Sequence, residues 1–317
     1  MHSRPLVDPQ LLPLLELIPP FDLSAEILPI LRNRSLPFFG NPKVKTAVAS
    51  QKRIIPGPAG ASDVVVHVYA PKGRDADLPC ILHIHGGGYV TGSAVDLWDI
   101  DCFLAGHLTC VVVSVDYRLA PETIFPGAIY DCYAALKWVF ANAPELAVDP
   151  GRIGVMGESA GGGLAAALAL LTRDLGEYDL AFQHLIYPML DDRTCTNPDP
   201  HRFAGEFIWT AQHNWFGWSS LLGAAPGGTA VSPYAAAARA QDLSRLPPAY
   251  IAAGALDLFL EEDLEYTRRL TRHGVPVELH VYPGAFHAFD LVPDAQVSAN
   301  ARRDSLAALR RVLHPAA

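Results

Sequence analysis

A serine lies between two glycines at a point where the chain changes from strand to helix. The apolar run 153–157 leads into Gly157-Glu158-Ser159-Ala160-Gly161, and an alanine- and leucine-rich run, 164–171, follows. The chain must reverse within a few residues here, so side chains two positions before and after the serine would collide, and glycine fits. This pattern is typical of a nucleophile elbow, which lifts one hydroxyl above a sheet beside the positive end of a helix.

A serine nucleophile requires a base, and the base requires a carboxylate that orients it. Asp257 ends the strand-like run 250–256, and His287 follows the run 279–282 in a short turn. Functional groups gather at the carboxyl ends of strands in a parallel sheet. The order Ser159, Asp257, His287 is the one expected of a sheet-borne serine hydrolase, and we predict that these three residues are catalytic.

Other acids and bases lie close to these partners in the sequence. His280 falls in the middle of a predicted strand, where a packed or edge-exposed histidine is the simpler interpretation. Glu261, Glu262 and Asp263 begin a predicted helix, where the helix dipole favours acidic residues. We therefore interpret them as helix-start residues, with Glu262 as a candidate support for the site.

A run of glycines directly after a predicted strand is suited to a developing negative charge. The strand 79–85 runs into His85-Gly86-Gly87-Gly88, whose backbone can approach a ligand closely. The Ala160 N–H follows the nucleophile and is a second source of a hydrogen bond. An oxyanion hole needs two or three such N–H groups, and we predict that the loop and Ala160 supply them.

These residues need a mostly parallel sheet to bring them together. Strands are predicted at 52–56, 63–69, 79–85, 109–117, 153–157, 181–188, 249–257 and 277–282, and helices at 128–141, after Ser159, at 261–273 and at 297–313. The first two strands form an antiparallel hairpin. Strands that alternate with helices in this way indicate an α/β fold, with a mostly parallel sheet covered by helices on both faces.

Two stretches depart from this alternation. Residues 1–45 contain short amphipathic pieces broken by prolines, which cannot bury their apolar faces alone and must lie on something larger. Residues 192–230 are rich in proline, glycine and aromatic residues. We predict that 1–45 is an N-terminal cap segment, that 46–317 is the core, and that 192–230 is a cap insertion within it.

Aromatic residues of the second stretch are candidates for a substrate pocket. Trp209 and Trp215 lie within it, and Tyr187 precedes it at the end of a predicted strand. The alternative for the tryptophans is packing inside the cap, since buried tryptophan is found in cores as well as in binding sites. We predict a mostly hydrophobic pocket that includes these three residues.

Composition excludes several classes of protein. The 317 residues are 50% hydrophobic and 18% charged, which suits one large α/β domain and excludes global disorder. A formal net charge of −9 argues against nucleic acid or an anionic membrane as the main partner. No run reaches the ~18 apolar residues of a membrane span, and the N-terminus lacks a secretory signal pattern. We predict no stable membrane insertion.

Cysteine and histidine usage bears on location and metals. Five cysteines are scattered without a CxxC pair, at positions 80, 102, 110, 132 and 195. An odd, dispersed set favours reduced thiols, and we predict a cytoplasmic location. His83 and His85 alternate onto one strand face, but no third residue shows metal-site spacing, so we predict no metal site. We interpret His85 as a residue that holds the glycine loop in shape.

Taken together, the motifs resemble one enzyme family. The sequence matches bacterial hormone-sensitive-lipase-like (family IV) carboxylesterases from about residue 40 to the C-terminus, through His85-Gly86-Gly87-Gly88, Asp116-Tyr117-Arg118-Leu119-Ala120-Pro121-Glu122, Gly157-Glu158-Ser159-Ala160-Gly161-Gly162, Ser232-Pro233-Tyr234 and Leu246-Pro247-Pro248-Ala249-Tyr250. The segments around Asp257 and His287 match as well. The sequence departs from the family pattern in three places. Glu158 stands where aspartate is usual, and Ala288 where glycine is frequent. The acid motif, commonly Asp-Pro-Leu-x-Asp-Glu, reads Asp257-Leu258-Phe259-Leu260-Glu261-Glu262 here.

The resemblance implies an α/β-hydrolase core with a helical cap and a Ser159–Asp257–His287 triad. It also implies an oxyanion hole at the N–H groups of Gly87, Gly88 and Ala160, and no metal or organic cofactor. The expected activity is hydrolysis of short- to medium-chain, mostly uncharged carboxylic esters. The partner would be a small-molecule ester, and the protein a monomer or homodimer.

Other functions of the same fold remain open at this point. A non-catalytic ligand-binding receptor on a hydrolase fold is one alternative, although such relatives lack an intact triad and Ser159, Asp257 and His287 are all present here. A lipase, a lactonase or an amide hydrolase would use the same residues. The sequence gives no role for Glu158.

Overall fold

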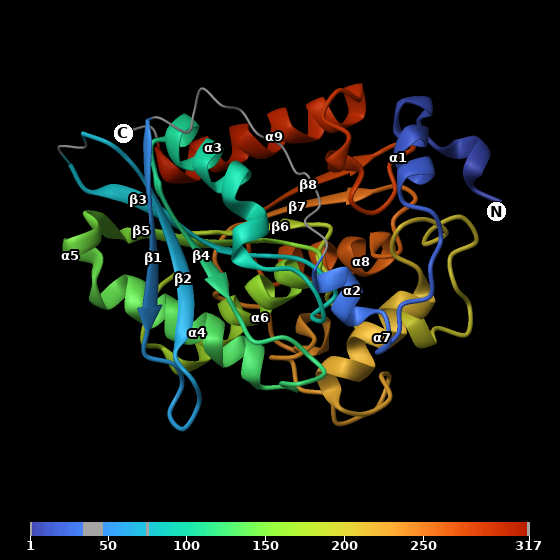
Figure 1. Ribbon diagram of the computed structural model, residues 1–317, viewed down its shortest axis with the longest axis horizontal. Helices are drawn as coiled ribbons and strands as arrows, with labels where there is room; N and C mark the ends of the chain where they lie inside the picture. The colour runs from blue at the N-terminus through green and yellow to red at the C-terminus, as the bar shows by residue number, and fades with distance from the viewer. Residues whose placement is uncertain (1, 34–46, 74–75, 316–317) are drawn as a thin grey trace.

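The computed structural model describes residues 2–33, 47–73 and 76–315, and Figure 1 shows their arrangement. In this part of the chain, eight strands form one sheet in the order β1-β2-β4-β3-β5-β6-β7-β8. They are β1 (Val48–Ile55), β2 (Val64–Pro71), β3 (Leu78–Ile84), β4 (Val111–Asp116), β5 (Val148–Glu158), β6 (Gln183–Ile186), β7 (Ala249–Gly254) and β8 (Val277–Tyr282). β1 and β2 pair antiparallel, as do β2 and β4, and all pairs from β4 to β8 are parallel. The predicted mostly parallel sheet and its first hairpin are confirmed.

Helices cover both faces of the sheet (Figure 1). The helices of the described residues are α1 (Leu12–Leu17), α2 (Leu28–Arg32), α3 (Trp98–Leu108), α4 (Gly127–Ala141), α5 (Ala143–Leu146), α6 (Ala160–Leu175), α7 (Ala211–Leu222), α8 (Leu260–Arg272) and α9 (Gln296–Leu313). α4, α6 and α8 share one core layer with side chains such as Leu82, whereas α3 and α9 share the other with Ile81. Burial on both faces explains why the central strands read as continuous apolar runs. No helix in the described ranges is long and apolar enough to cross a bilayer.

The sequence patterns do not predict α3. Its first turn carries Asp99 and Asp101, and the Asp101 side chain is fully buried against the sheet layer. A charged residue at a core-facing position interrupts the apolar period by which a helix is recognised. The helices α4, α6, α8 and α9 correspond to predicted ones, whereas the short α5 is not predicted.

α6 starts directly after Ser159 and is buried from Ala160 through Thr172. Small residues in its first turn permit this close packing: a Cβ added to Gly161 would lie 2.0 Å from the carbonyl oxygen of Ile84 in β3. The start of α6 is therefore held against the carboxyl ends of β3 and β5, where the elbow and the glycine loop meet.

The N-terminal segment packs on this same end of the sheet. The Asp8 N–H donates to the Gly284 carbonyl at 3.0 Å. The Arg32 guanidinium, at the end of α2, donates to the Val90 carbonyl at 2.8 Å and to the Glu122 carboxylate at 2.8 Å. α2 is thereby fixed beside the chain that follows the glycine loop.

The stretch 192–230 carries α7, which contacts the N-terminal segment. His213 Nε2 lies 2.8 Å from the Phe21 carbonyl oxygen, and the two rings stack at 4.7 Å. The two stretches predicted to form a cap thus touch each other, and their role as a cap stays a prediction. The predicted boundary between residues 45 and 46 lies outside the described residues.

One carboxylate in α8 is buried without compensation. Asp263 is fully buried, and in the described part of the chain neither of its carboxylate oxygens has a hydrogen-bond partner. Burial, and then the charges of Glu262 and Asp257, raise the pKa of the Asp263 carboxyl well above its usual value. The folded protein holds this proton more tightly than the unfolded chain, so stability falls as pH rises above about 3.9 towards the folded pKa.

We expect Asp263→Asn to raise the free energy of unfolding by about 1–3 kcal/mol at about pH 8, because it removes an unpaired buried charge without changing the shape. The gain should shrink near pH 4, where the wild-type carboxyl is protonated. Urea titrations at both pH values measure it, with the exposed neighbour Glu261→Gln as the control. An Asp263→Asn protein less stable than wild type at pH 8 would contradict the argument.

Candidate active site

Three side chains meet at the carboxyl end of the sheet. Ser159 follows β5, Asp257 follows β7 and His287 follows β8. Ser159 Oγ lies 2.9 Å from His287 Nε2, and His287 Nδ1 lies 2.8 Å from Asp257 Oδ2. The structure brings the three residues that were predicted to be catalytic into one hydrogen-bonded chain.

The members of this chain are shielded from water. The exposed fractions are 6% for Ser159, 5% for His287 and 0% for Asp257. Asp257 Oδ1 accepts the Phe259 N–H at 3.0 Å, and the Phe259 ring meets the imidazole edge-on at 5.2 Å. Asp257 is thus fixed through both oxygens, and it holds the His287 ring with Nε2 directed at the serine.

The backbone at Ser159 is strained. The residue has φ 55° and ψ −121°, a conformation that costs a non-glycine residue about 1–3 kcal/mol. Its N–H donates to the Ile186 carbonyl at 2.9 Å, and its carbonyl accepts the Gly163 N–H at 3.0 Å. A Cβ on Gly157 would lie 2.3 Å from the Gly161 carbonyl oxygen, which is the collision inferred from the sequence.

The glycine loop lies directly against the elbow. A Cβ on Gly86 would lie 3.4 Å from Ser159 Cβ, and Gly87 has φ 115°, where side chains are disfavoured. Gly86 of the loop therefore lies beside the serine on one side, and Ala160 follows the serine at the start of α6. The role of Gly87, Gly88 and Ala160 as an oxyanion hole stays a prediction.

His85 is bonded to the loop itself. Its Nδ1 lies 2.8 Å from the Gly86 carbonyl oxygen, and its ring stacks on Tyr117 at 4.2 Å. The Tyr117 hydroxyl donates to the His85 carbonyl at 2.9 Å. Burial lowers the pKa of the imidazole, which favours its neutral form. These contacts suit a residue that shapes the loop.

The aromatic residues predicted for the pocket lie in different places. A Cβ on Gly88 would lie 2.1 Å from Trp209 Cη2, and the Trp209 ring lies 6.3 Å from the His287 ring. Tyr187 meets His287 edge-on at 4.8 Å. Trp215, in contrast, lies on α7 with 47% of its surface exposed. Trp209 and Tyr187 thus border the triad, whereas Trp215 faces outward.

The alternative acids and bases occupy other positions. Glu262 Oε1 accepts the Leu190 N–H at 2.6 Å and the Asp191 N–H at 3.2 Å, so it ties α8 to the chain after β6. His280 Nε2 lies 2.8 Å from Glu278 Oε1 on the same strand. Glu262 therefore supports the loops around the site, and His280 belongs to a separate edge of the sheet.

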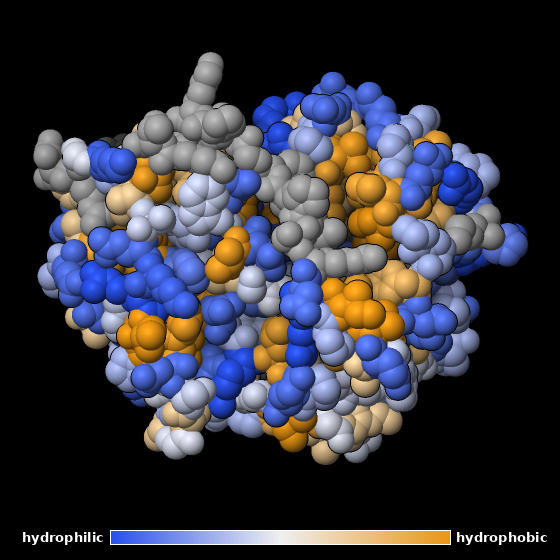
Figure 2. Space-filling view, viewed as in Figure 1, coloured by the Kyte–Doolittle hydropathy of each residue, from blue (hydrophilic) through white to orange (hydrophobic). Residues whose placement is uncertain are grey.

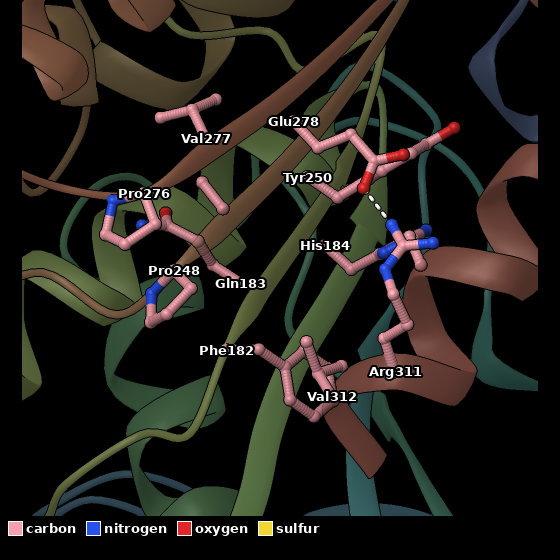
Figure 3. Close-up of a pocket in the computed structure, with 12 residues that line it drawn as sticks. Phe182, Gln183, His184, Pro248, Tyr250, Pro276, Val277, Glu278, Arg311 and Val312 are labelled. Carbon is pink, nitrogen blue, oxygen red and sulfur yellow. Dashed lines mark hydrogen bonds and ion pairs between the residues drawn. The ribbon is translucent and has the colours of Figure 1, made fainter. Parts of the chain in front are cut away.

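A cavity of about 260 Å³ lies elsewhere in the molecule (Figure 3). Its lining includes Gln183, Ala249 and Val277, which are the first residues of β6, β7 and β8. The triad lies past the opposite ends of the strands. This cavity, closed on one side by Val312 of α9, is therefore separate from the triad.

Comparison with protein families assigns the fold. A family described as having the alpha/beta hydrolase fold matches residues 81–291, which is more than half of the chain. The chain belongs to this α/β-hydrolase family. The motifs' resemblance to hormone-sensitive-lipase-like enzymes is confirmed.

Individual relatives align over nearly their full length. Carboxylesterase NlhH of Mycobacterium tuberculosis is 35% identical, with 98% of each chain covered. Esterase LipI of the same species is 35% identical, with 98% of this chain and 97% of LipI covered. A solved bacterial heroin esterase is 37% identical with a TM-score of 0.90, over 99% of this chain and 100% of that one. Esterase LipW from Mycobacterium marinum is 32% identical with a TM-score of 0.83, over 98% and 97%.

This α/β-hydrolase also has site residues that the sequence patterns do not reveal. The Tyr187 hydroxyl donates to Asp290 Oδ1 at 2.7 Å, and His83 lies between Asp101 and Glu158. The sequence signal at His83 is its alternation with His85 on one strand face, a pattern that can also indicate a metal site. In the ranges that the structure describes, no group of three or more His, Cys, Asp and Glu residues is placed to hold a metal ion.

The geometry predicts which histidine activates the serine. We expect His287→Gln to slow the labelling of Ser159 by a fluorophosphonate at least about 10³-fold, because the base that takes the hydroxyl proton is lost. His280→Gln serves as the matched control and should label at close to the wild-type rate. The time course of labelling, followed by intact-protein mass, measures both. Equal slowing by the two variants would rule out the assignment of His287.

Proposed function

We infer that the chain is a serine carboxylesterase, a carboxylic-ester hydrolase, whose preferred substrates are uncharged small-molecule esters with short to medium acyl chains. The observation that carries this inference is the Ser159–His287–Asp257 hydrogen-bond chain beside a glycine loop. Nearly full-length relatives that are named carboxylesterase and esterase support the activity.

In the proposed reaction, His287 Nε2 takes the Ser159 proton as Oγ attacks the ester carbonyl carbon. The imidazolium that forms is stabilised by Asp257, which stays ionised. His287 then gives the proton to the leaving alcohol, and an acyl group remains on Ser159 Oγ. A water molecule, deprotonated by the same imidazole, releases the carboxylic acid and restores the serine.

The carbonyl oxygen gains negative charge at both tetrahedral stages. We assign its stabilisation to the N–H groups of Gly87 and Gly88, in the loop whose Gly86 lies beside Ser159, and of Ala160, which follows the nucleophile. The start of α6 adds the positive end of a helix at the same place. Preorganised donors of this kind act strongly in a site from which water is excluded, and the low exposure of Ser159 fits that requirement.

The cap assignment rests on two contacting stretches. We propose that residues 1–45 and 192–230 form the cap over the site. Trp209, from the second stretch, lies against Gly88, and the two stretches meet at His213. Figure 2 shows apolar surface on the side of the molecule that carries α1, α2 and α7, where exposed apolar side chains include Leu17, Ile30 and Trp215. An apolar approach of this kind favours uncharged esters.

We propose a cytoplasmic protein that works as a monomer or homodimer. Support for the location comes from the cysteines, which are dispersed along the chain without a CxxC pair, four of them buried. Size-exclusion chromatography with light scattering would distinguish the two assembly states.

The direct test of the activity is Ser159→Ala assayed with an aryl acetate. We expect turnover to fall at least about 10⁴-fold, because the acyl group has no acceptor. Ser50→Ala, at an exposed position on β1, is the control and should keep wild-type rates. Retained turnover in Ser159→Ala would refute the mechanism, and ligand binding by wild type without an acyl-enzyme would favour the receptor alternative.

The position of Trp209 predicts a limit on substrate size. Initial rates over aryl esters of increasing acyl length should peak at short to medium chains in the wild type. The Trp209 indole packs against Gly88 of the oxyanion loop. We therefore expect Trp209→Leu to raise kcat/KM for longer or bulkier esters, relative to short ones, by roughly 10-fold. Trp215→Leu removes an exposed indole from the same stretch and should leave the profile unchanged. Identical profiles for wild type and Trp209→Leu would exclude Trp209 as the wall.

A further inference from the structure

One buried histidine on the strand next to β5, which leads to the nucleophile, has no part in the proposed reaction. His83 of β3 is fully buried. Its Nδ1 lies 2.6 Å from Asp101 Oδ1 on α3, and its Nε2 lies 2.8 Å from Glu158 Oε1 at the end of β5. We call these three residues the His83 clamp.

The contacts fix the charge of the imidazole. A neutral imidazole has one N–H and one acceptor nitrogen, whereas both nitrogens of His83 face carboxylate oxygens, which only accept. With both carboxylates ionised, His83 is doubly protonated between them. Burial raises the pKa of the Asp101 carboxyl, and the charge of His83 opposes that rise. Burial opposes this charge, but Glu158 and Asp101 outweigh it and raise the pKa of His83 to about 10.

The clamp joins the strand that leads to the glycine loop and the strand that leads to the nucleophile. His83 lies two residues before the glycine loop, and Glu158 lies directly before Ser159. β3 and β5 are hydrogen-bonded neighbours, with Ile84 opposite Gly157. A Cβ on Gly86 would lie 3.0 Å from the Glu158 carbonyl oxygen, so the loop rests on the residue that His83 holds.

We propose that His83 is a positioning residue which, as an imidazolium between Asp101 and Glu158, fixes the spacing between Ser159 Oγ and the N–H groups of the oxyanion loop. The inference rests on the proposed function. It gives Glu158 a role that the nucleophile motif alone does not. It also explains the charged residue at a core-facing position of α3, because Asp101 anchors the far side of the imidazole.

A positioning role differs from a purely structural one in what it changes. A shift of about 1 Å between nucleophile and oxyanion donors weakens transition-state binding, while ground-state binding of the ester is largely kept. Loss of the clamp should therefore lower kcat more than it raises KM. It should also weaken binding of a trifluoromethyl ketone, which adds to Ser159 and mimics the tetrahedral intermediate, in the same proportion as kcat/KM.

The chain offers a matched control in His184 of β6, which is labelled in Figure 3. Met156 of β5 lies between His83 and His184 in the register of the sheet, so the two histidines lie on one row. His184 is also buried, but its Nε2 lies 2.8 Å from a neutral group, the Ser305 hydroxyl. Burial, and then the charge of His83, lower the pKa of His184 to about 3, so it is neutral.

The experiment compares His83→Gln with His184→Gln in the full chain, with an aryl acetate as substrate. We expect His83→Gln to lose about 10²-fold in kcat with KM within about 2-fold, and to lose affinity for the trifluoromethyl ketone by a similar factor. His184→Gln should stay within about 3-fold of wild type in all three measurements. A folded His83→Gln protein with wild-type kcat would overturn the proposal, as would equal losses in both variants.

The pH profile adds a readout specific to the charge. The groups that face His83 are Asp101 from α3 and Glu158 from β5, and the charge of His83 acts in turn on His184 of β6. Because the pKa of His83 is raised, its favourable pairing is complete below about 6.5 and is lost as pH rises through about 10. We expect a reversible fall in wild-type kcat around pH 10, where the folded protein loses the His83 proton, and this step should be missing in His83→Gln.

A measurement on the wild type covers the case in which His83→Gln fails to fold. The ring signals of His83, followed by nuclear magnetic resonance, should remain those of an imidazolium at about pH 8 and should shift in Glu158→Gln. A His83 signal that titrates near or below the ordinary pKa would overturn the clamp. If the wild type hydrolyses no ester, the proposed function fails, while this titration still decides whether His83 is a cation.

Discussion

The strained conformation of Ser159 is the constraint on which the site depends. A non-glycine residue at φ 55° is held only where its surroundings over-determine it, and here hydrogen bonds act on both sides of the residue. The Met189 N–H also donates to the Ser159 carbonyl, at 2.9 Å, so the chain beyond β6 shares in the restraint. Burial of α6 from Ala160 onward gives the hydrophobic stabilisation that offsets about 1–3 kcal/mol of strain. The core thus maintains the geometry of a single turn.

The chemistry at Ser159 requires that water be kept away from the hydrogen-bond chain. Aromatic rings around the site provide this shielding. Trp209 lies on the glycine loop, while Phe259 and Tyr187 meet His287 edge-on. The rings exclude solvent from the hydrogen-bond chain, which strengthens its electrostatics. They also leave the imidazole little freedom to turn away from Ser159. Packing and catalysis therefore place the same demand on these positions.

The mostly parallel sheet and the meeting of Ser159, Asp257 and His287 could be predicted from the sequence, because each signal is local: an apolar run, then a functional residue at its end. The His83 clamp could not. The contacts of His83 depend on the pairing of β3 with β5 and on the packing of α3 against one face of the sheet. The sequence does not predict α3, because Asp101 at a core-facing position interrupts its apolar period. The sequence does not distinguish Trp209 from Trp215. In the structure α7 begins between them, so that Trp209 lies beside the site while Trp215 faces solvent.

Buried carboxylates show how the loops around the site are held once the core has formed. Asp131 is fully buried and bonded to Arg118 at 2.7 Å, which fixes the loop after β4. Asp192 is fully buried and bonded to Arg239 at 2.7 Å, and it also accepts the Gly227 N–H at 2.6 Å, which closes the stretch 192–230. Breaking such a pair by removing one partner costs about 3–5 kcal/mol, although the intact pair contributes little net stability. Their contribution is therefore to specificity of position: hydrophobic burial determines that the strands and helices assemble, and these pairs determine where the loops that carry the chemistry come to rest.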